Sequence, residues 1–414
     1  MRLATARSVC LYLTLTLLTA GTVRADEPAP PAAAPQETTD VGDLWRLVRH
    51  KDAASDVSRD PDSRKRFFVV APSIGSKPST GLTGGFSGNM AFFRGDPQST
   101  HISSISGGFK ISQKKQTLGG VKLAMFTEDD RWFIQGDARL SWTSQNTYGL
   151  GTQTLLGAAE NASYTYHRLF ETIYRQVEPG LFVGFGINVS DHSNVRPSQS
   201  AVATWDESAY VAYNREHGFA DDGQRSSGTS VGLLFDTRDN AINAQRGWLA
   251  SATYRTFFDG FLGGDASWQQ LYLDLRTYKT LTGGGRRKLA FWFQGDLVTN
   301  GTAPYLDLPA TAANERSARG YGEGRYRGEH LLYGEMEYRS ALTKSGLLGF
   351  VAFLNVTTVD SRETGEKLFD AFAPGAGLGL RVLLNKRSRT NLCTDYGWGK
   401  QGSRGFYLAI QEAF

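Results

Sequence analysis

From residue 66 to residue 414 the chain consists of segments of about ten residues in which apolar and polar side chains alternate, separated by clusters of Gly, Asp, Asn, Ser and Thr. In the clearest segment, 131–142, the apolar positions are Trp132, Ile134, Ala138, Leu140 and Trp142, and the polar ones are Arg131, Gln135, Asp137, Arg139 and Ser141. A period of two places these sets on opposite faces of a β-strand. The pattern recurs in 271–276, 331–339 and 378–384. It predicts an all-β protein whose strands each have one apolar and one charged face.

The end of the chain distinguishes a membrane barrel from a soluble sandwich, which also alternates. Phe406, Leu408, Ile410 and Phe414 fall on one face of the last predicted strand. We expect this strand to close against the first, so that no edge stays unpaired and an aromatic residue lies in the interfacial girdle. We also expect these four residues to act as the signal read by the barrel assembly machinery during biogenesis. Charged faces should point inward, because an Arg or Lys facing lipid costs about 2–4 kcal/mol.

The alternating segments number about sixteen, an even number typical of closed antiparallel outer-membrane barrels in contact with lipid. With both barrel ends in the periplasm, the long connections Ser190–Ser226 and Thr299–Glu329 fall outside the cell. The predicted strands begin near Phe67, Gly81, Thr100, Thr117, Arg131, Asn161, Val177, Ser227, Gly247, Ser267, Lys288, His330, Leu347, Ala373, Thr390 and Gly405.

Three regions precede or form the barrel. Residues 1–25 have the form of a secretory signal peptide, with an apolar run from Ser8 to Leu18 and a plausible cleavage site after Ala25. Residues 26–65 are predicted to be a periplasmic segment that is rich in Ala and Pro at first and then forms a short amphipathic helix over residues 41–48. The helix is expected to rest on the barrel rim, with a plug or a docking segment for a partner as alternatives. Residues 66–414 form the barrel.

Composition supports this organisation. The chain has 47 Gly, 24 Phe, 17 Tyr and 8 Trp but only 4 Met, which favours many strands and tight turns over a helical core. A net charge of +4 is too balanced to indicate nucleic-acid binding. The six histidines are scattered, and Cys393 is the one cysteine left after cleavage, so we expect no metal site, no cofactor and no disulfide.

Four stretches resemble the bacterial surface antigen barrels, a family that includes the BamA and TamA outer-membrane assembly factors and the two-partner secretion transporters. They are Asp236-Thr237-Arg238-Asp239-Asn240 with Gly247 after it, Ala318-Arg319-Gly320-Tyr321, Glu335-Met336-Glu337-Tyr338-Arg339, and Gly375-Ala376-Gly377-Leu378-Gly379-Leu380-Arg381. The closing strand through Asp395, Tyr396 and Phe414 belongs to the resemblance, and residues 71–81 look like the opening hairpin of relatives without POTRA domains. We expect no POTRA domain here, because residues 26–65 are too short to form one.

The resemblance implies that Arg319, Gly320 and Tyr321 lie on an extracellular lid loop that folds into the lumen. Arg319 would bind Glu337, because a guanidinium can make charge-assisted bonds to an inward carboxylate. The family has an inward Asp one strand further on, where this chain has Asn355, so we expect a weaker latch. Arg319 is either a static brace or a moving element of transport.

Other candidate sites have ordinary structural explanations. Asp236, Arg238, Asp239 and Gly247 are typical of a tight periplasmic turn that sets strand register. Glu335 and Glu337 lie on one strand face beside Arg339 and are expected to be neutralising lumen partners rather than catalytic acids. Ser230 lies in a Gly-x-Ser-x-Gly pattern, but its strand runs on to Phe235 where a nucleophile elbow needs a turn and a helix. No enzyme is therefore predicted.

The leading hypothesis is a barrel of the BamA and TamA type in the outer membrane of a Gram-negative cell. It would insert or translocate proteins or other macromolecules through a weak seam and the Arg319 lid. A separate periplasmic partner, docked at residues 41–48, would deliver the client. The alternative is a passive pore, or a plugged barrel that serves as a surface scaffold, whose inward charges set ion selectivity.

Overall fold

A computed structural model describes residues 38–48, 66–77, 81–198, 202–281, 286–313 and 316–414. The expected signal peptide and the linker over residues 26–36 lie outside this part of the chain. The described residues contain two α-helices, α1 (Val41–Val48) and α2 (Ala209–His217), and neither is long and apolar enough to cross a membrane.

Sixteen strands form the described barrel. The first eight are β1 (Phe67–Lys77), β2 (Gly81–Phe92), β3 (Ser103–Ser112), β4 (Thr117–Phe126), β5 (Trp132–Thr147), β6 (Glu160–Glu178), β7 (Leu181–Pro197) and β8 (Gly223–Asp236). The second eight are β9 (Gly247–Phe257), β10 (Trp268–Thr280), β11 (Arg287–Gly301), β12 (His330–Ala341), β13 (Leu348–Val359), β14 (Ala373–Asn385), β15 (Thr390–Gly399) and β16 (Arg404–Ile410). Each begins within a few residues of its predicted start, so the predicted number and order of strands are confirmed.

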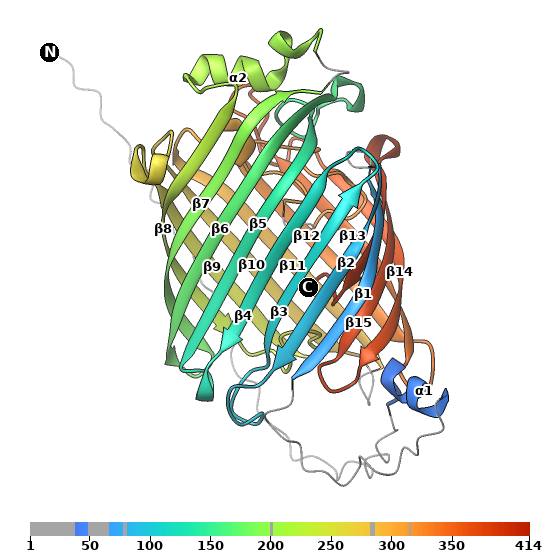
Figure 1. Cartoon of the computed structure of the whole chain (residues 1–414). Helices are drawn as coiled ribbons and strands as arrows, with labels where there is room; N and C mark the ends of the chain where they lie inside the picture. Colours follow the sequence, from blue (N-terminus) through green and yellow to red (C-terminus); the bar gives the residue numbers. More distant parts are fainter. Residues whose placement is uncertain (1–37, 49–65, 78–80, 199–201, 282–285, 314–315) are drawn as a thin grey trace, which may run out of the picture. The chain divides into compact units, whose positions relative to one another are not determined.

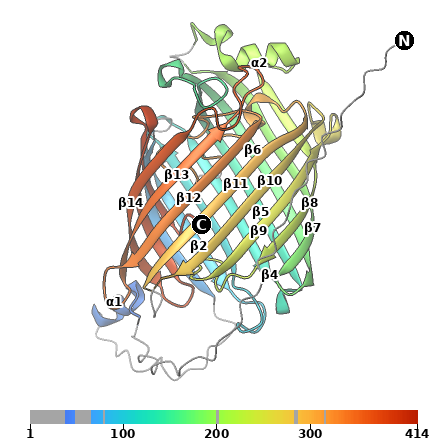
Figure 2. The same cartoon turned by 180° about the vertical axis from the view of Figure 1, so that it is seen from behind.

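Every strand pairs antiparallel with its sequence neighbours, and β1 meets β16 (Figures 1 and 2). The long connections 198–222 and 302–329 both emerge at the end that carries α2, and α1 lies at the other end. This agrees with the predicted arrangement of long loops on one side. Closure is incomplete, however: the described part of β1 pairs with β16 only through Ser76 and Phe406. The predicted closure of the last strand against the first is therefore confirmed, but most of the described part of β1 has no paired residue on β16 and stays an unpaired edge.

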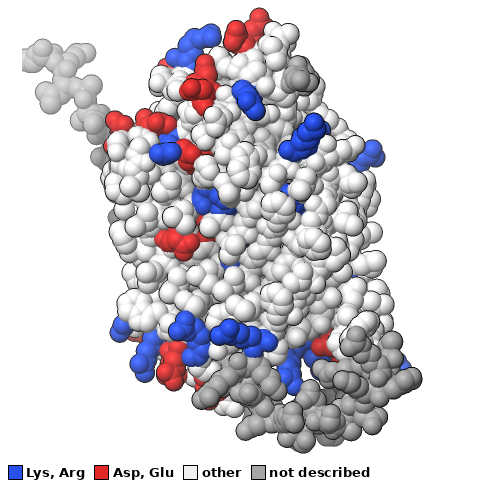
Figure 3. Space-filling model, in the orientation of Figure 1, with Lys and Arg blue, Asp and Glu red and all other residues white. Residues whose placement is uncertain are grey.

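The two faces of the strands follow the predicted alternation. On β10, Asp274 is buried while Leu275 is exposed, and on β12 Glu335 is buried while Met336 is exposed. Space-filling Figure 3 shows charged side chains mainly toward the two ends of the visible wall, with few between them. Inward charges and an apolar outer belt are what a lipid-facing barrel requires. Glu171 on β6 departs from this pattern, because it lies in the outward row between Leu169 and Ile173.

The end of the barrel that carries α2 is capped by packed loops. Helix α2 is capped at its start by Ser208, whose hydroxyl accepts a hydrogen bond from the amide of Val211 at 3.2 Å, and at its end by Gly218, whose φ of 76° favours glycine. Tyr210 and Tyr213 of α2 pack edge-on against Tyr305 of the 302–329 loop. These buried aromatic rings join two long loops over the mouth of the barrel.

Helix α1 contacts the periplasmic turns. The Asp40 carboxylate accepts hydrogen bonds from the amide of Asp43 at 2.9 Å, which caps the helix, and from the amide of Lys386 at 2.9 Å. Lys386 also makes an ion pair with Asp43 at 2.8 Å. The amide of Thr39 donates to the carbonyl of Ser345 at 3.0 Å. The helix thus rests on the turns after β12 and β14, as expected of a rim helix, and does not plug the lumen.

Candidate functional site: a lumenal cluster around Arg319

The 302–329 loop, which we call the lid loop, folds into the barrel and carries Arg319 to the inner wall of β12. The turn needs a left-handed backbone at Ala318 (φ 53°) and at Gly320 (φ 110°). A Cβ at Gly320 would lie 2.7 Å from the carbonyl oxygen of Trp398 on β15, so only glycine allows this close approach. The Arg-Gly-Tyr element is therefore shaped by packing against β15.

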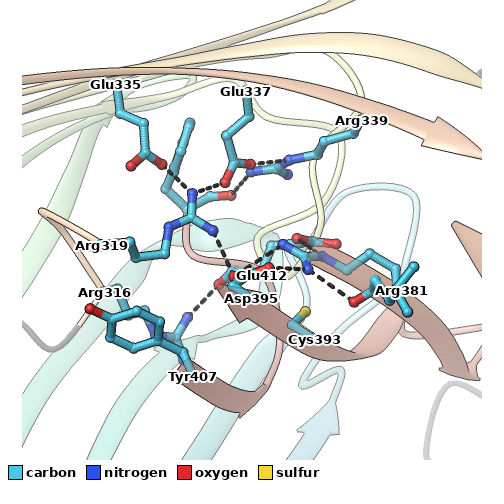
Figure 4. Close-up of polar contacts among 12 residues, drawn as sticks. Arg316, Arg319, Glu335, Glu337, Arg339, Arg381, Cys393, Asp395, Tyr407 and Glu412 are labelled. Atoms are coloured by element: carbon cyan, nitrogen blue, oxygen red, sulfur yellow. Dashed lines mark hydrogen bonds and ion pairs between the residues drawn. The ribbon is translucent and has the colours of Figure 1, made fainter. Parts of the chain in front are cut away.

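Arg319 binds three carboxylates (Figure 4). Its guanidinium donates to Glu335 at 2.5 Å, to Glu337, and to Asp395 at 2.7 Å. The guanidinium also stacks over the ring of Phe353, with 3.8 Å from Cζ to the ring centroid. Only 2% of Arg319 is exposed, so the charge is neutralised entirely by protein groups.

Two more arginines extend the cluster. Arg339 on β12 donates to Glu337 at 2.5 Å. Arg381 on β14 binds Asp395 at 2.6 Å and Glu412, beyond β16, at 2.7 Å. Three arginines thus alternate with four buried carboxylates. Removing one member leaves an uncompensated buried charge, which typically costs about 3–5 kcal/mol.

The neighbours of Arg319 fix the loop backbone. Tyr321 donates its hydroxyl to the carbonyl of Pro374 and accepts from the amide of Lys400 at 2.8 Å. The amide of Gly320 donates to the hydroxyl of Tyr407 at 3.0 Å. The lid tip is therefore bound to β14, to the turn after β15, and to β16.

The two predicted partners of Arg319, Glu337 and Asn355, contact different parts of this residue. Glu337 is in contact with it, as the resemblance implied. Asn355 lies beside it but donates its amide to the main-chain carbonyl of Arg319 at 3.1 Å. The inference of a latch with one charged partner missed Glu335 and Asp395. The sequence did contain a signal for Asp395, because the alternation along β15 places this acid on the lumenal face, where it can pair with an arginine.

The lid loop has a second anchor on the opposite wall. Asp307 accepts hydrogen bonds from Ser190 on β7 and from Ser226 on β8, both at 2.6 Å. Arg327 donates to the carbonyls of Tyr305, Leu306 and Leu308 and so holds the same turn. The sequence carries no sign of this role for Asp307, because nothing local shows that a loop carboxylate will meet two strand hydroxyls.

The turn after β8 has the geometry expected of a register-setting turn. Arg238 makes a bidentate pair with Asp236 at 2.9 and 2.7 Å. Burial would raise the pKa of Asp239, but its hydrogen bond with Arg389 at 2.6 Å and the positive charge of Arg389 lower it. Gly247 has a φ of 102°, and any Cβ there would overlap the carbonyl of Thr237. The turn therefore joins the periplasmic ends of β8, β9 and β14.

The end of the chain departs from the predicted final strand. Strand β16 stops at Ile410, Gln411 adopts a φ of 76°, and Figures 1 and 2 mark the chain end within the barrel. Phe414 is buried with its ring 5.2 Å from that of Trp292 on β11. The prediction that Phe414 shares a lipid-facing row with Phe406, Leu408 and Ile410 is wrong. One signal was available: a straight strand would have put Glu412 in that same row.

Ser230 lies in the middle of β8, and its hydroxyl accepts a hydrogen bond from Asn188 at 2.9 Å. The strand continues without the turn of a nucleophile elbow. Over the residues that the structure describes, no group of His, Cys, Asp and Glu has the arrangement of a metal site. Cys393 is buried on β15.

Apolar outside, charged inside, and entered by an extracellular loop, this molecule is a transmembrane β-barrel with an internally braced lid loop. The model of the Omp85 superfamily domain matches residues 104–414. The chain belongs to the Omp85 superfamily, whose barrels are outer-membrane proteins. No curated protein matches the sequence.

Solved structures show the same fold at low identity. BamA from Haemophilus ducreyi lacking POTRA domains 1–3 superimposes with a TM-score of 0.53 and 12% identity, over 84% of this chain and 70% of that one. CdiB from Acinetobacter baumannii gives 0.53 and 12%, over 84% and 59%, and CdiB from Escherichia coli gives 0.51 and 10%, over 83% and 62%. The chain thus spans less than two thirds of either CdiB.

Proposed function

We propose that this barrel inserts or translocates macromolecules, most simply outer-membrane proteins, through the seam between β1 and β16, with Arg319 latching the lid loop. The observation that carries this proposal is the seam itself. All other neighbouring strands share at least seven paired positions, whereas the described parts of β1 and β16 share one. Unpaired backbone groups at such an edge can accept another β-strand.

Residues 411–414, which we call the tail, explain why β1 and β16 share so few paired positions. If β16 continued in the register set by Ser76 and Phe406, then Phe414 would lie opposite Phe68 near the start of β1. In the structure residues 411–414 turn inward instead, and Pro72 of β1 could not donate a hydrogen bond in any case. Most of β1 therefore presents a free edge on the side facing β16.

The tail and the lid are bound to one charged cluster. Arg381 binds both Asp395, which holds Arg319, and Glu412 of the tail. Arg339 binds Glu337 and also donates to the main-chain oxygen of Phe414 at 2.9 Å. Arg381 and Arg339 thus each bind one carboxylate that Arg319 also binds and one group of the tail, so a shift of the lid changes the ion pairs that hold the tail. Opening of the lid and release of the tail should therefore be coupled.

A disulfide across the seam tests the proposal. The pair Ser76→Cys and Phe406→Cys, in a Cys393→Ala background, would lock β1 to β16. We expect the oxidised protein in lipid vesicles to stop accelerating the insertion of an unfolded outer-membrane barrel, followed by its shift on unheated gels, and reduction to restore the activity. A disulfide at Thr229 and Thr256, paired on β8 and β9, is the matched control. Equal activity of the locked and reduced seam would exclude a role for the seam.

We also propose a separate periplasmic partner that delivers clients at α1. The helix is fixed by Asp40 and Asp43, while Leu44 and Trp45 are exposed on it. Cross-linking from position 44 in intact cells should yield an adduct that disappears when Lys386→Glu detaches the helix. Adducts with lipid alone would remove α1 as a docking point.

The rival function is a passive pore or a plugged surface scaffold. The buried lid and tail favour a plugged scaffold over an open pore, because Tyr321, Tyr326 and Phe414 are packed in one lumenal cluster. Single-channel recording distinguishes the two functions. A steady large conductance in the wild type would favour the pore, and silence in both the wild type and Arg319→Ala would favour the scaffold.

A further inference from the structure

Glu171 lies in the middle of the lipid-facing wall. It pairs across the strands with Gly136 on β5 and Ile187 on β7. Gly136 lies between Trp132 and Trp142, two exposed tryptophans that mark the aromatic girdles of β5. The same outward row of β6 holds Leu169 and Ile173, which are 46% and 54% exposed. Glu171 is therefore a carboxylate within the apolar belt.

The Glu171 carboxylate has no partner among the barrel residues that the structure describes. None of the described residues gives it a hydrogen bond or an ion pair, and the charge that acts on it is that of another acid, Asp137. Its oxygens occupy the space that a side chain at position 136 would fill, so Gly136 forms a shallow notch that lets the carboxylate lie against the wall. Ionisable groups facing the membrane interior are costly and are typical of functional contacts.

A polar cluster lies on the extracellular side of Glu171, beyond Leu169. Two outward positions above it, His167 of β6 binds Asp191 of β7 at 3.1 Å, and Asp191 also binds Arg225 of β8 at 2.8 Å. The carboxylate of Asp191 is thus paired with both His167 and Arg225. Glu171, in contrast, is paired with no cation among the described residues of this wall, so a cation would have to come from another molecule.

We propose that the outer wall of β5–β7 is an interface for a different membrane protein, which places a Lys or Arg against Glu171 within the bilayer. A cation is the complement that offsets the cost of a desolvated carboxylate. A second copy of this chain does not offer one at that depth, because the outward cations of the described strands lie near strand ends. They are Arg175, Arg196, Arg225, Lys279, Arg287 and Arg404.

Site-specific photo-cross-linking in intact cells tests this interface. A benzoylphenylalanine at Ile187 should form an adduct with another membrane protein, and the linked peptide should carry a Lys or Arg in a membrane-spanning segment. Glu171→Leu should reduce this adduct about tenfold, the effect of losing roughly 1.4 kcal/mol of interaction. The same probe at Leu380 on β14 is the control and should react with lipid only.

Three results would overturn the interface. They are an adduct with a second copy of this chain, lipid adducts alone at Ile187, and an adduct that Glu171→Leu leaves unchanged. The purified barrel supplies an independent readout. Without its partner, Glu171→Leu should raise the urea midpoint for unfolding from lipid vesicles, because it removes a carboxylate from the hydrocarbon. A lower midpoint would mean that the barrel itself uses Glu171, which also contradicts the proposal.

Discussion

Replacing Arg319 by Ala should loosen the lid by a measurable amount. Glu337 and Asp395 would keep Arg339 and Arg381, but Glu335 would lose its ion pair and retain only uncharged neighbours, Tyr333 and Asn355. One orphaned buried carboxylate corresponds to the lower end of the 3–5 kcal/mol range, or about 3 kcal/mol. If the closed lid bears this whole loss, the ratio of closed to open lids falls about a hundredfold.

The lid population can be measured by the reaction rate of a cysteine at Ser317, which is buried at the lid tip. In a Cys393→Ala background, we expect a membrane-impermeant maleimide to label this position about a hundred times faster in Arg319→Ala than in the parent. Adding Glu335→Gln should bring labelling back toward the parental rate, because it neutralises the orphaned charge from which the hundredfold change follows. Labelling at the parental rate in Arg319→Ala would refute the latch, and labelling in the double variant that stays a hundredfold fast would show that the orphaned charge of Glu335 is not what loosens the lid.

Three further outcomes follow from the structure. Gly247→Ala should destabilise the barrel by about 2 kcal/mol in urea unfolding, because it combines a positive φ with a clash against a carbonyl; unchanged stability would mean that the turn adapts. Burial opposes protonation of His101, but its hydrogen bond with Asp130 and the charge of Asp236 raise its pKa above the usual 6.5. The protonated imidazole therefore stabilises the folded barrel. This contribution is complete below pH 6.5 and is lost as the pH rises through the raised pKa. His101→Gln should remove that part of the pH dependence of the urea midpoint between pH 6 and pH 8. Phe414→Ala should cost about 3 kcal/mol and expose the tail to carboxypeptidase, and continued protection would contradict its anchoring role.

The sequence alone determined the strands, their faces and the order of the loops. These features depend on local alternation, since a period of two assigns each side chain to lumen or lipid wherever the strand lies. It also gave the contact between Arg319 and Glu337, through a resemblance carried by short motifs. The glycine at position 247 was informative for the same local reason, because its positive φ is a property of one turn.

Only the tertiary structure decided which lumenal groups meet. Asp395 instead of Asn355 completes the charge of the Arg319 site, because the curvature of the barrel brings β15 to the lid tip. Residues 411–414 leave the strand because burying Phe414 and pairing Glu412 inside stabilises the chain more than a carboxylate facing lipid would. Glu171 faces outward because the alternation that turns Arg168 into the lumen leaves an odd-numbered acid on the other side. Partner choice across a lumen is non-local, so periodicity along the chain cannot specify it.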